Sequence, residues 1–176
     1  MFKNFFPSKI LKLTNKTINN LVFFLIIISV IGLVYSLVLS PADYIQGDSV
    51  RIMYVHVPSS FIAIGTFGII GTASIINLVF KNKITPLIAK SLSSVGFLFA
   101  IISIITGSLW GKPTWGIWWV WDARLTSMLI LLFFYISYIL TWKVIKKFEK
   151  ANKISSVIAI IGLFNLPIIR YSVDWW

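Results

Sequence analysis

The feature that most constrains this chain is a series of long apolar runs separated by short charged segments. An α-helix needs roughly 20 consecutive apolar residues to cross a bilayer. The 176 residues are 58% hydrophobic and only 12% charged, which excludes a soluble domain. We therefore expect an all-α integral membrane protein, a bundle of about five transmembrane helices. The runs cover about residues 21–39, 52–80, 86–109, 125–142 and 154–169.

The basic residues divide between the two sides of these runs. Twelve lysines fall before the first run and in segments 81–90 and 143–153, whereas the intervening segments hold few cations. Because lysine and arginine accumulate in cytoplasmic loops, the lysine-rich side and the N-terminus are predicted to be cytoplasmic. The net charge of +11 is thus explained by membrane topology, and we expect no nucleic-acid partner.

Two parts of the chain follow from this topology. Residues 1–20 are predicted to form a basic cytoplasmic leader, and residues 21–176 a polytopic membrane domain. An outer-face loop at residues 110–127 belongs to the second part. All four aspartates, the only histidine and seven of the eight tryptophans lie on the outer side, so we expect the function there.

The outer loop is unusually rich in tryptophan, with the sequence WGKPTWGIWWVWDARLTS. Trp115, Trp118, Trp119 and Asp122 are spaced i, i+3, i+4 and i+7, so a helical segment would present them on one face as an aromatic shelf. A simpler interpretation is an interfacial belt, where indoles anchor span ends. Five indoles between residues 110 and 121 exceed what anchoring requires, which favours a platform for a flat apolar ligand.

The charges beside the shelf have structural alternatives. Asp122 could cap the fourth span, with its carboxylate accepting from the amides of Arg124 or Leu125. Arg124 could anchor the interface or pair with a ligand carboxylate. Neither charge decides between these roles alone.

His56 lies in the motif VHVPSS at the outer mouth of the second span, where Pro58 suits a first helical turn. One interpretation is a hydrogen-bonded polar residue at a helix start. The other is an iron ligand, because neutral imidazole is a frequent axial ligand of haem and ionisable residues near membranes are functional candidates. Both interpretations stay open on this motif alone.

Other reaction chemistry is scarce in the sequence. The chain has no cysteine, no second histidine, no carboxylate pair at catalytic spacing and no glycine-rich phosphate loop, so we do not expect an enzyme. Polar residues inside the spans are interpreted as helix-packing and hydrogen-bonding positions. They are Thr66, Thr72, Ser74, Asn77, Ser91, Ser93 and Ser94.

Three motifs carry a family resemblance. The segment WGIWWVWDARLTS resembles the "WWD" signature of haem-handling proteins of cytochrome c maturation. Together with VHVPSS and the closing NLPIIRYSVDWW, it is similar to the C component of that system, the haem exporter protein C family. The family has six spans and a second histidine shortly after the SVDWW-type motif. We therefore expect this chain to be truncated at its C-terminus; otherwise water or a partner would complete the iron coordination.

The resemblance implies transient binding of haem b on the outer face, with His56 as an axial ligand. The implied haem platform comprises Trp115, Trp118, Trp119, Trp121 and Asp122. An outer-face cation, Arg51, Lys112 or Arg124, could meet a propionate.

The resemblance also implies a setting and partners. Haem would pass to a periplasmic haem chaperone (E component), beside an ABC-type ATPase and its membrane subunit (A and B components) and a small D component. The implied location is the bacterial inner membrane, or the mitochondrial inner membrane for an organelle-encoded chain. The alternative is a cofactor-free transport or channel subunit whose tryptophans form only a belt. A haem lyase enzyme is disfavoured by the chain length and the missing thiol.

Overall fold

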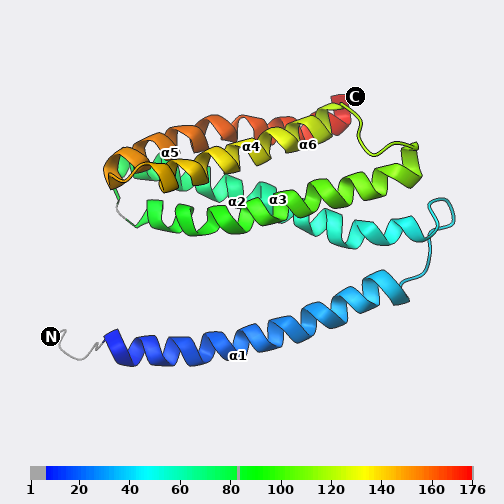
Figure 1. The fold of residues 1–176 in the computed structure, drawn as a ribbon, viewed down its shortest axis with the longest axis horizontal. Coiled ribbons are helices and arrows are strands. Elements are labelled where there is room, and N and C mark those ends of the chain that lie inside the picture. The colour runs from blue at the N-terminus through cyan, green and yellow to red at the C-terminus, as the bar shows by residue number, and fades with distance from the viewer. Residues whose placement is uncertain (1–6, 83, 176) are drawn as a thin grey trace. The chain divides into compact units, whose positions relative to one another are not determined.

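The computed structural model describes residues 7–82 and 84–175, and almost all of them are helical (Figure 1). Within these residues the only extended pairing is an isolated bridge between Asp43 and Gly47. The all-α prediction is therefore confirmed. The helices are α1 (Pro7–Val34), α2 (Met53–Phe80), α3 (Thr85–Trp115), α4 (Ala123–Val144), α5 (Phe148–Leu163) and α6 (Asn165–Trp175), with a π-helical turn at Tyr35–Leu39 and a 3-10 turn at Asp48–Ile52.

Five helical segments are long and apolar enough to cross a bilayer, which confirms the predicted number for the described residues. The third segment continues to Trp115, six residues beyond the predicted end at Leu109. The segments are Thr17–Leu39, Asp48–Phe80, Thr85–Trp115, Ala123–Val144 and Phe148–Ser172.

The last segment consists of two helices and not one. α5 ends at Leu163 and α6 begins at Asn165, with Phe164 between them. Pro167 explains the break, since it has no backbone N–H to donate and is tolerated in the first turn of a helix. The Asn165 side chain donates to the carbonyl of Ser127 at 2.8 Å, which ties this interruption to α4.

The chain forms two compact units, Met1–Ala42 and Asp43–Trp176. In the first unit, the apolar segment Thr17–Leu39 buries none of its side chains inside the structure. A helix that is apolar on all sides suits hydrocarbon surroundings. α1 starts at Pro7 and so includes much of the basic segment; the boundary between leader and membrane domain at residue 20 stays a prediction.

The second unit is a helical bundle in which α2 packs against α3 and α5, and α4 packs against α3, α5 and α6. Its centre is formed by fully buried Phe67, Ile70, Leu131 and Tyr135. The Tyr135 hydroxyl donates to the carbonyl of Ala63 at 2.8 Å. Gly96 permits this contact, because a Cβ there would collide with the Tyr135 hydroxyl. A small residue at a helix crossing is typical of membrane bundles.

The polar residues inside the spans behave in two ways. The Asn77 amide donates from α2 to Asn152 Oδ1 at 2.9 Å and Ser156 Oγ at 3.2 Å in α5, as predicted for an interhelical contact. Others donate instead to carbonyls of their own helix, as Thr72, Ser74 and Ser91 do four residues back. Serine and threonine hydroxyls often form this hydrogen bond to a backbone carbonyl inside helices.

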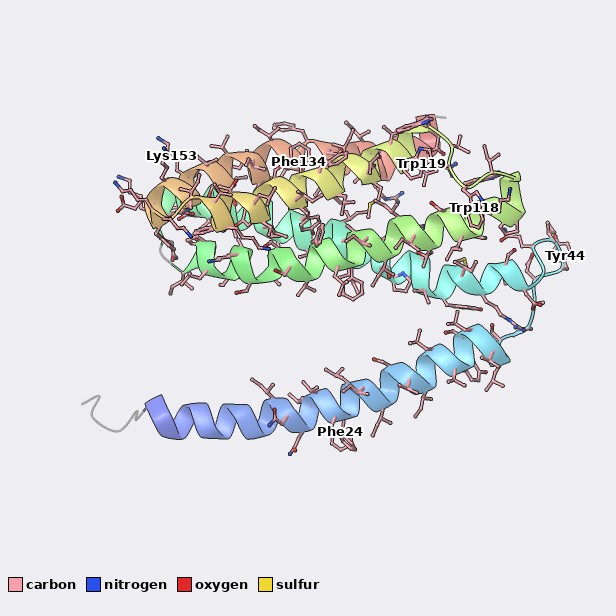
Figure 2. All side chains as sticks on the ribbon, in the orientation of Figure 1. Phe24, Tyr44, Trp118, Trp119, Phe134 and Lys153 are labelled. Atoms are coloured by element: carbon pink, nitrogen blue, oxygen red, sulfur yellow. The ribbon has the colours of Figure 1, made fainter. Side chains whose placement is uncertain are left out.

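The two ends of the second unit differ in chemistry. Trp118 and Trp119 lie at one end of the bundle and Lys153 at the other (Figure 2). We call them the indole end and the lysine end. The indole end contains the start of α2, the end of α3 and the start of α4, so His56 and the tryptophan-rich segment share it. The lysine end contains Lys81, Lys90, Lys143 and Lys153.

Candidate ligand site at the indole end

His56 lies in the first turn of α2, which begins at Met53 after the 3-10 turn. Pro58 is therefore inside the helix, five residues after Met53, and not in the first turn as its motif predicted. Ser60 donates its hydroxyl to the His56 carbonyl at 2.9 Å, and its oxygen lies 2.6 Å from Ser103 Oγ of α3. These bonds hold the start of α2 against α3.

The imidazole of His56 has one nitrogen committed. Its Nδ1 lies 3.0 Å from the carbonyl oxygen of Ser103 and 3.2 Å from Thr106 Oγ1. A carbonyl can only accept, so Nδ1 carries the hydrogen and Nε2 of the neutral ring keeps its lone pair. Histidines that bind metals commonly donate their other N–H to a backbone carbonyl in this way. The geometry therefore leaves Nε2 chemically suited to ligation.

Two residues of α3 fit the imidazole into place. Gly107 has no side chain, and a Cβ at this position would lie 3.0 Å from His56 Cε1. The Trp110 ring meets the imidazole edge-on, with 5.9 Å between the ring centroids. A side chain at position 107 would therefore press on the imidazole, which glycine avoids.

A cavity of about 320 Å³ lies beside His56, within the size range of small-molecule sites. Its walls come from the loop before α2, from α2, from the end of α3 and from the start of α4. The walls are mostly apolar. They comprise Gln46, His56, Gly107, Trp110, Gly111, Thr114, Trp115, Arg124 and Leu125.

The predicted aromatic shelf on one helical face is wrong. α3 ends at Trp115, and Gly116 adopts the left-handed region at φ 77°, with its N–H donating to the Lys112 carbonyl at 3.0 Å. Glycine at this position ends a helix without steric cost. Residues 117–122 are not helical, and α4 begins only at Ala123. Trp118, Trp119 and Asp122 therefore cannot share a helix face with Trp115.

Of the predicted platform residues, Trp115 lines the cavity beside His56. Trp118 and Trp121 lie on the following loop and are 55% and 75% exposed. Trp119 meets Trp121 edge-on at 5.5 Å between centroids, and its buried Nε1 has no hydrogen-bond partner among the described residues. The loop indoles thus lie outside the cavity wall.

Asp122 caps α4, as the structural alternative predicted. Its Oδ1 accepts from the Leu125 amide at 2.8 Å, and its Oδ2 accepts from Arg124 Nη2 at 2.8 Å and Nε at 3.1 Å. The carboxylate is buried, whereas the Arg124 side chain is about half exposed. Arg124 also lies over the Trp115 ring, 5.5 Å from its centroid, and lines the cavity. Asp122 therefore holds a cation at the cavity wall.

The two other predicted cations contact different groups. Lys112 Nζ donates to the Gly116 carbonyl at 2.7 Å and lies 5.8 Å from the centroid of Trp118. Arg51 pairs with Asp48 at 3.3 Å. Neither lines the cavity beside His56, so Arg124 is the member of this group that the structure brings to it.

A short loop closes the cavity from the α2 side. Asp43 Oδ1 accepts from the amides of Ile45 and Gln46, and these bonds hold the pKa of its carboxyl below the ordinary value. Gly47, at φ 59°, closes the turn through two backbone hydrogen bonds with Asp43. Gln46 Oε1 then accepts from Trp110 Nε1 at 2.9 Å. The loop thereby fixes the indole that faces His56.

Apart from Trp115, which was predicted, several site residues were missed from the sequence although α3 carries a signal for them. Gly107, Trp110, Gly111, Thr114 and Trp115 are spaced i, i+3, i+4, i+7 and i+8, which is one face of a helix. Because the third span was predicted to end at Leu109, this helix face was not recognised. The contribution of Gln46 has no comparable pattern, because it depends on a loop hydrogen bond.

These features define a polytopic α-helical membrane protein. It has an indole-lined cavity at one end of its bundle and an imidazole nitrogen there that is suited to ligation. Comparison with known proteins then gives the family. Residues 1–176 match the family model described as "Heme exporter protein C", and the chain belongs to that family, as the sequence motifs predicted.

Curated relatives agree with this assignment. The chain is 42% identical to "Heme exporter protein C" of Escherichia coli K12 over 151 residues, 86% of this chain and 62% of the relative. It is 39% identical to the Bradyrhizobium diazoefficiens protein of the same name, over 97% of this chain and 64% of the relative. A Marchantia polymorpha "putative cytochrome c biosynthesis ccmC-like mitochondrial protein" is 39% identical over 80% of this chain and 59% of its own length. The chain thus spans less than two thirds of these relatives.

Proposed function

We propose that this chain binds haem transiently at the indole end and presents it for the maturation of c-type cytochromes. One observation carries the proposal: His56 Nδ1 is held by the Ser103 carbonyl, which leaves Nε2 free to ligate iron at a cavity lined by Trp110 and Trp115. The indole faces supply apolar contact and limit the access of water to the iron. The family name and the names of the relatives support haem as the ligand.

Arg124 is the propionate partner in this proposal. Its guanidinium lies at the cavity wall on the Trp115 ring, and Asp122 orients it. An arginine held in place by a carboxylate can still donate N–H groups to a second carboxylate. Lys112 and Arg51 are bonded away from the cavity, which makes them weaker candidates.

The loop indoles Trp118, Trp119 and Trp121 would extend the platform beyond the cavity. With a volume of about 320 Å³ and an open side, the cavity can grip only part of a tetrapyrrole ring. Partial enclosure suits a cargo that is released again.

The proposed setting is the bacterial inner membrane, or the mitochondrial inner membrane for an organelle-encoded chain. The lysine end would face the cytoplasm, in line with the positive-inside bias. Haem b would leave to a periplasmic haem chaperone, within a complex of the ABC-type ATPase, its membrane subunit and the small D component. No bond-making chemistry on haem is assigned to this chain.

The test is haem spectroscopy on the purified chain and on a His56→Gly variant. We expect the imidazole-ligated Soret and visible bands of the wild type to be lost in the variant. Added imidazole should restore them, because it can occupy the space that the side chain left. Identical iron coordination in both proteins, without imidazole, would remove His56 from the proposal.

A second candidate is a cofactor-free transport or channel subunit. The exposure of Trp118 and Trp121 favours it, because interfacial anchors point away from the protein in this manner. In that case replacing Trp118 and Trp119 by Phe leaves activity intact. A haem platform predicts instead that the same variant inserts normally but transfers less haem to the chaperone.

A further inference from the structure

A second cavity, of about 550 Å³, lies at the lysine end, remote from His56. It forms where α2 ends and α5 begins, so it faces the other membrane surface from the site described above. Most of its lining surface is apolar, but the lining includes Lys81 and Lys153, which carry ammonium groups, and the amide side chains of Asn77, Asn82 and Asn152. Nothing in the proposed haem function uses these residues.

The buried polar side chains of this cavity are hydrogen-bonded within the protein. Asn77 is 4% exposed, and its amide donates to Asn152 and Ser156 across the α2–α5 contact. Asn82 Oδ1 accepts from the Ile84 amide at 2.8 Å, which leaves the side-chain NH₂ as the group able to donate to a ligand. The cavity therefore offers mainly donors.

The charges of the cavity favour an anionic ligand. Neither Lys81 nor Lys153 forms an ion pair within the part of the chain that the structure describes. Glu149 also lines the cavity, but it lies on the exposed first turn of α5 among Lys147 and Lys150. The local balance stays positive, and the first-turn amides of α5, which have no side-chain cap, add to it.

The rim of the cavity is apolar. Leu78 and Phe148 line it and are 38% and 43% exposed, next to helices that continue into the membrane. A soluble anion would leave this rim in water, whereas an amphipathic anion would cover it. Basic pockets between membrane helices at this depth can bind acidic lipid headgroups.

We propose that the lysine-end cavity binds the phosphate headgroup of an anionic phospholipid, with Lys81 and Lys153 on the phosphate and the acyl chains along Leu78 and Phe148. A bound lipid would join the end of α2 to the start of α5. A choline headgroup fits less well, because it would add a cation beside the lysines.

The test is native mass spectrometry on the full chain purified in detergent, with dioleoyl phosphatidylglycerol or dioleoyl phosphatidylcholine added. We expect the wild type to retain several-fold more phosphatidylglycerol. A Lys81→Asn/Lys153→Gln variant should fall to the phosphatidylcholine level. Asn suits position 81 because residue 81 has φ 51°, a conformation that asparagine tolerates.

The matched control is Lys146→Gln/Lys150→Gln, which removes the same charge from exposed positions outside the cavity. It should retain phosphatidylglycerol within about twofold of the wild type. Equal losses in the two double variants would overturn the proposal in favour of diffuse surface charge. Displacement of the lipid by millimolar sodium phosphate would also overturn it, since a free anion would then suffice. Should Lys81→Asn prevent folding, Lys153→Gln alone on the surface of α5 gives the same comparison.

Discussion

At the residue scale, the site depends on how closely His56 approaches α3. Its ring lies against Gly107, and its Nδ1 is bonded to the Ser103 carbonyl. The imidazole is therefore oriented by the backbone carbonyl of Ser103 and by the space that Gly107 leaves. Neither contribution can be recognised in the motif VHVPSS itself, because Gly107 and Ser103 lie on α3.

The substitution Gly107→Ala should weaken the binding of haem without lowering the stability of the helix. The added Cβ would lie 3.0 Å from His56 Cε1 and displace the ring, so we expect haem to bind about tenfold more weakly, the scale of a lost outer-shell contact. Helix stability should not fall, because alanine is favoured over glycine inside a helix by roughly 1 kcal/mol. Absorbance titration and thermal unfolding measure the two effects. Gly65→Ala in α2, where a Cβ meets no atom within 4 Å, is the control and should bind haem normally; equal affinity of both variants would contradict the prediction.

Arg124→Gln should weaken the binding of haem but not of haem dimethyl ester. Arg124 is the cation at the cavity wall, and the ester has no carboxylate for it to meet. The expected loss for haem is about tenfold, comparable to one charged hydrogen bond. Comparing two ligands in one variant removes any general effect of leaving Asp122 without its partner. Lys112→Gln should bind both ligands as the wild type does; a parallel loss of both ligands in Arg124→Gln would refute the propionate contact.

At the element scale, the end of α3 decides where the indoles go. Gly116 stops the helix in the left-handed region, and Asp122 starts the next one, so the intervening loop carries Trp118 to Trp121 away from the cavity wall. Spacing alone suggested one continuous helical face. A glycine within the segment was the signal against it, because a helix commonly ends at such a residue.

Gly116→Ala should destabilise the bundle, since a non-glycine residue at φ 77° costs on the order of 1–3 kcal/mol. Thermal unfolding in detergent should show a lower midpoint. Gly116→Asn should lose less, because asparagine enters this region more readily. If the alanine variant were as stable as the asparagine variant, the left-handed cap would not be what fixes this loop.

Much of the fold could be predicted from apolar runs, whereas the site could be predicted only in part. Run length is a direct consequence of bilayer thickness, so five spans followed from it. The cap formed by Asp122 was one of the two interpretations that its local sequence left open. The contact between Trp110 and Gln46 could not be predicted, because it joins residues 64 positions apart through a loop whose geometry depends on the Asp43 turn. The break at Phe164 was signalled by Pro167 but not located.

At the scale of the whole molecule, the second unit has two ends with opposed chemistry. One has an indole-lined cavity beside the His56 imidazole, and the other has a lysine-lined cavity with an apolar rim. Because α2 contains His56 in its first turn and ends directly before Lys81, a single helix connects the two sites. The proposed function requires that these ends face opposite compartments, with the imidazole on the side where c-type cytochromes mature.

That orientation can be measured directly, because the chain has no natural cysteine. Tyr44→Cys places a thiol in the loop beside the indole-end cavity, at a position that is 93% exposed, and Lys150→Cys places one at the exposed start of α5. A membrane-impermeant maleimide added to cells with a permeabilised outer membrane should label Tyr44→Cys. It should label Lys150→Cys only after the inner membrane is opened, since the lysine-rich side is held in the cytoplasm by the positive-inside bias. The cysteine-free parent chain controls for background. Labelling of Lys150→Cys in intact inner membranes, with Tyr44→Cys protected, would put His56 in the cytoplasm and make delivery to a periplasmic chaperone from this cavity impossible.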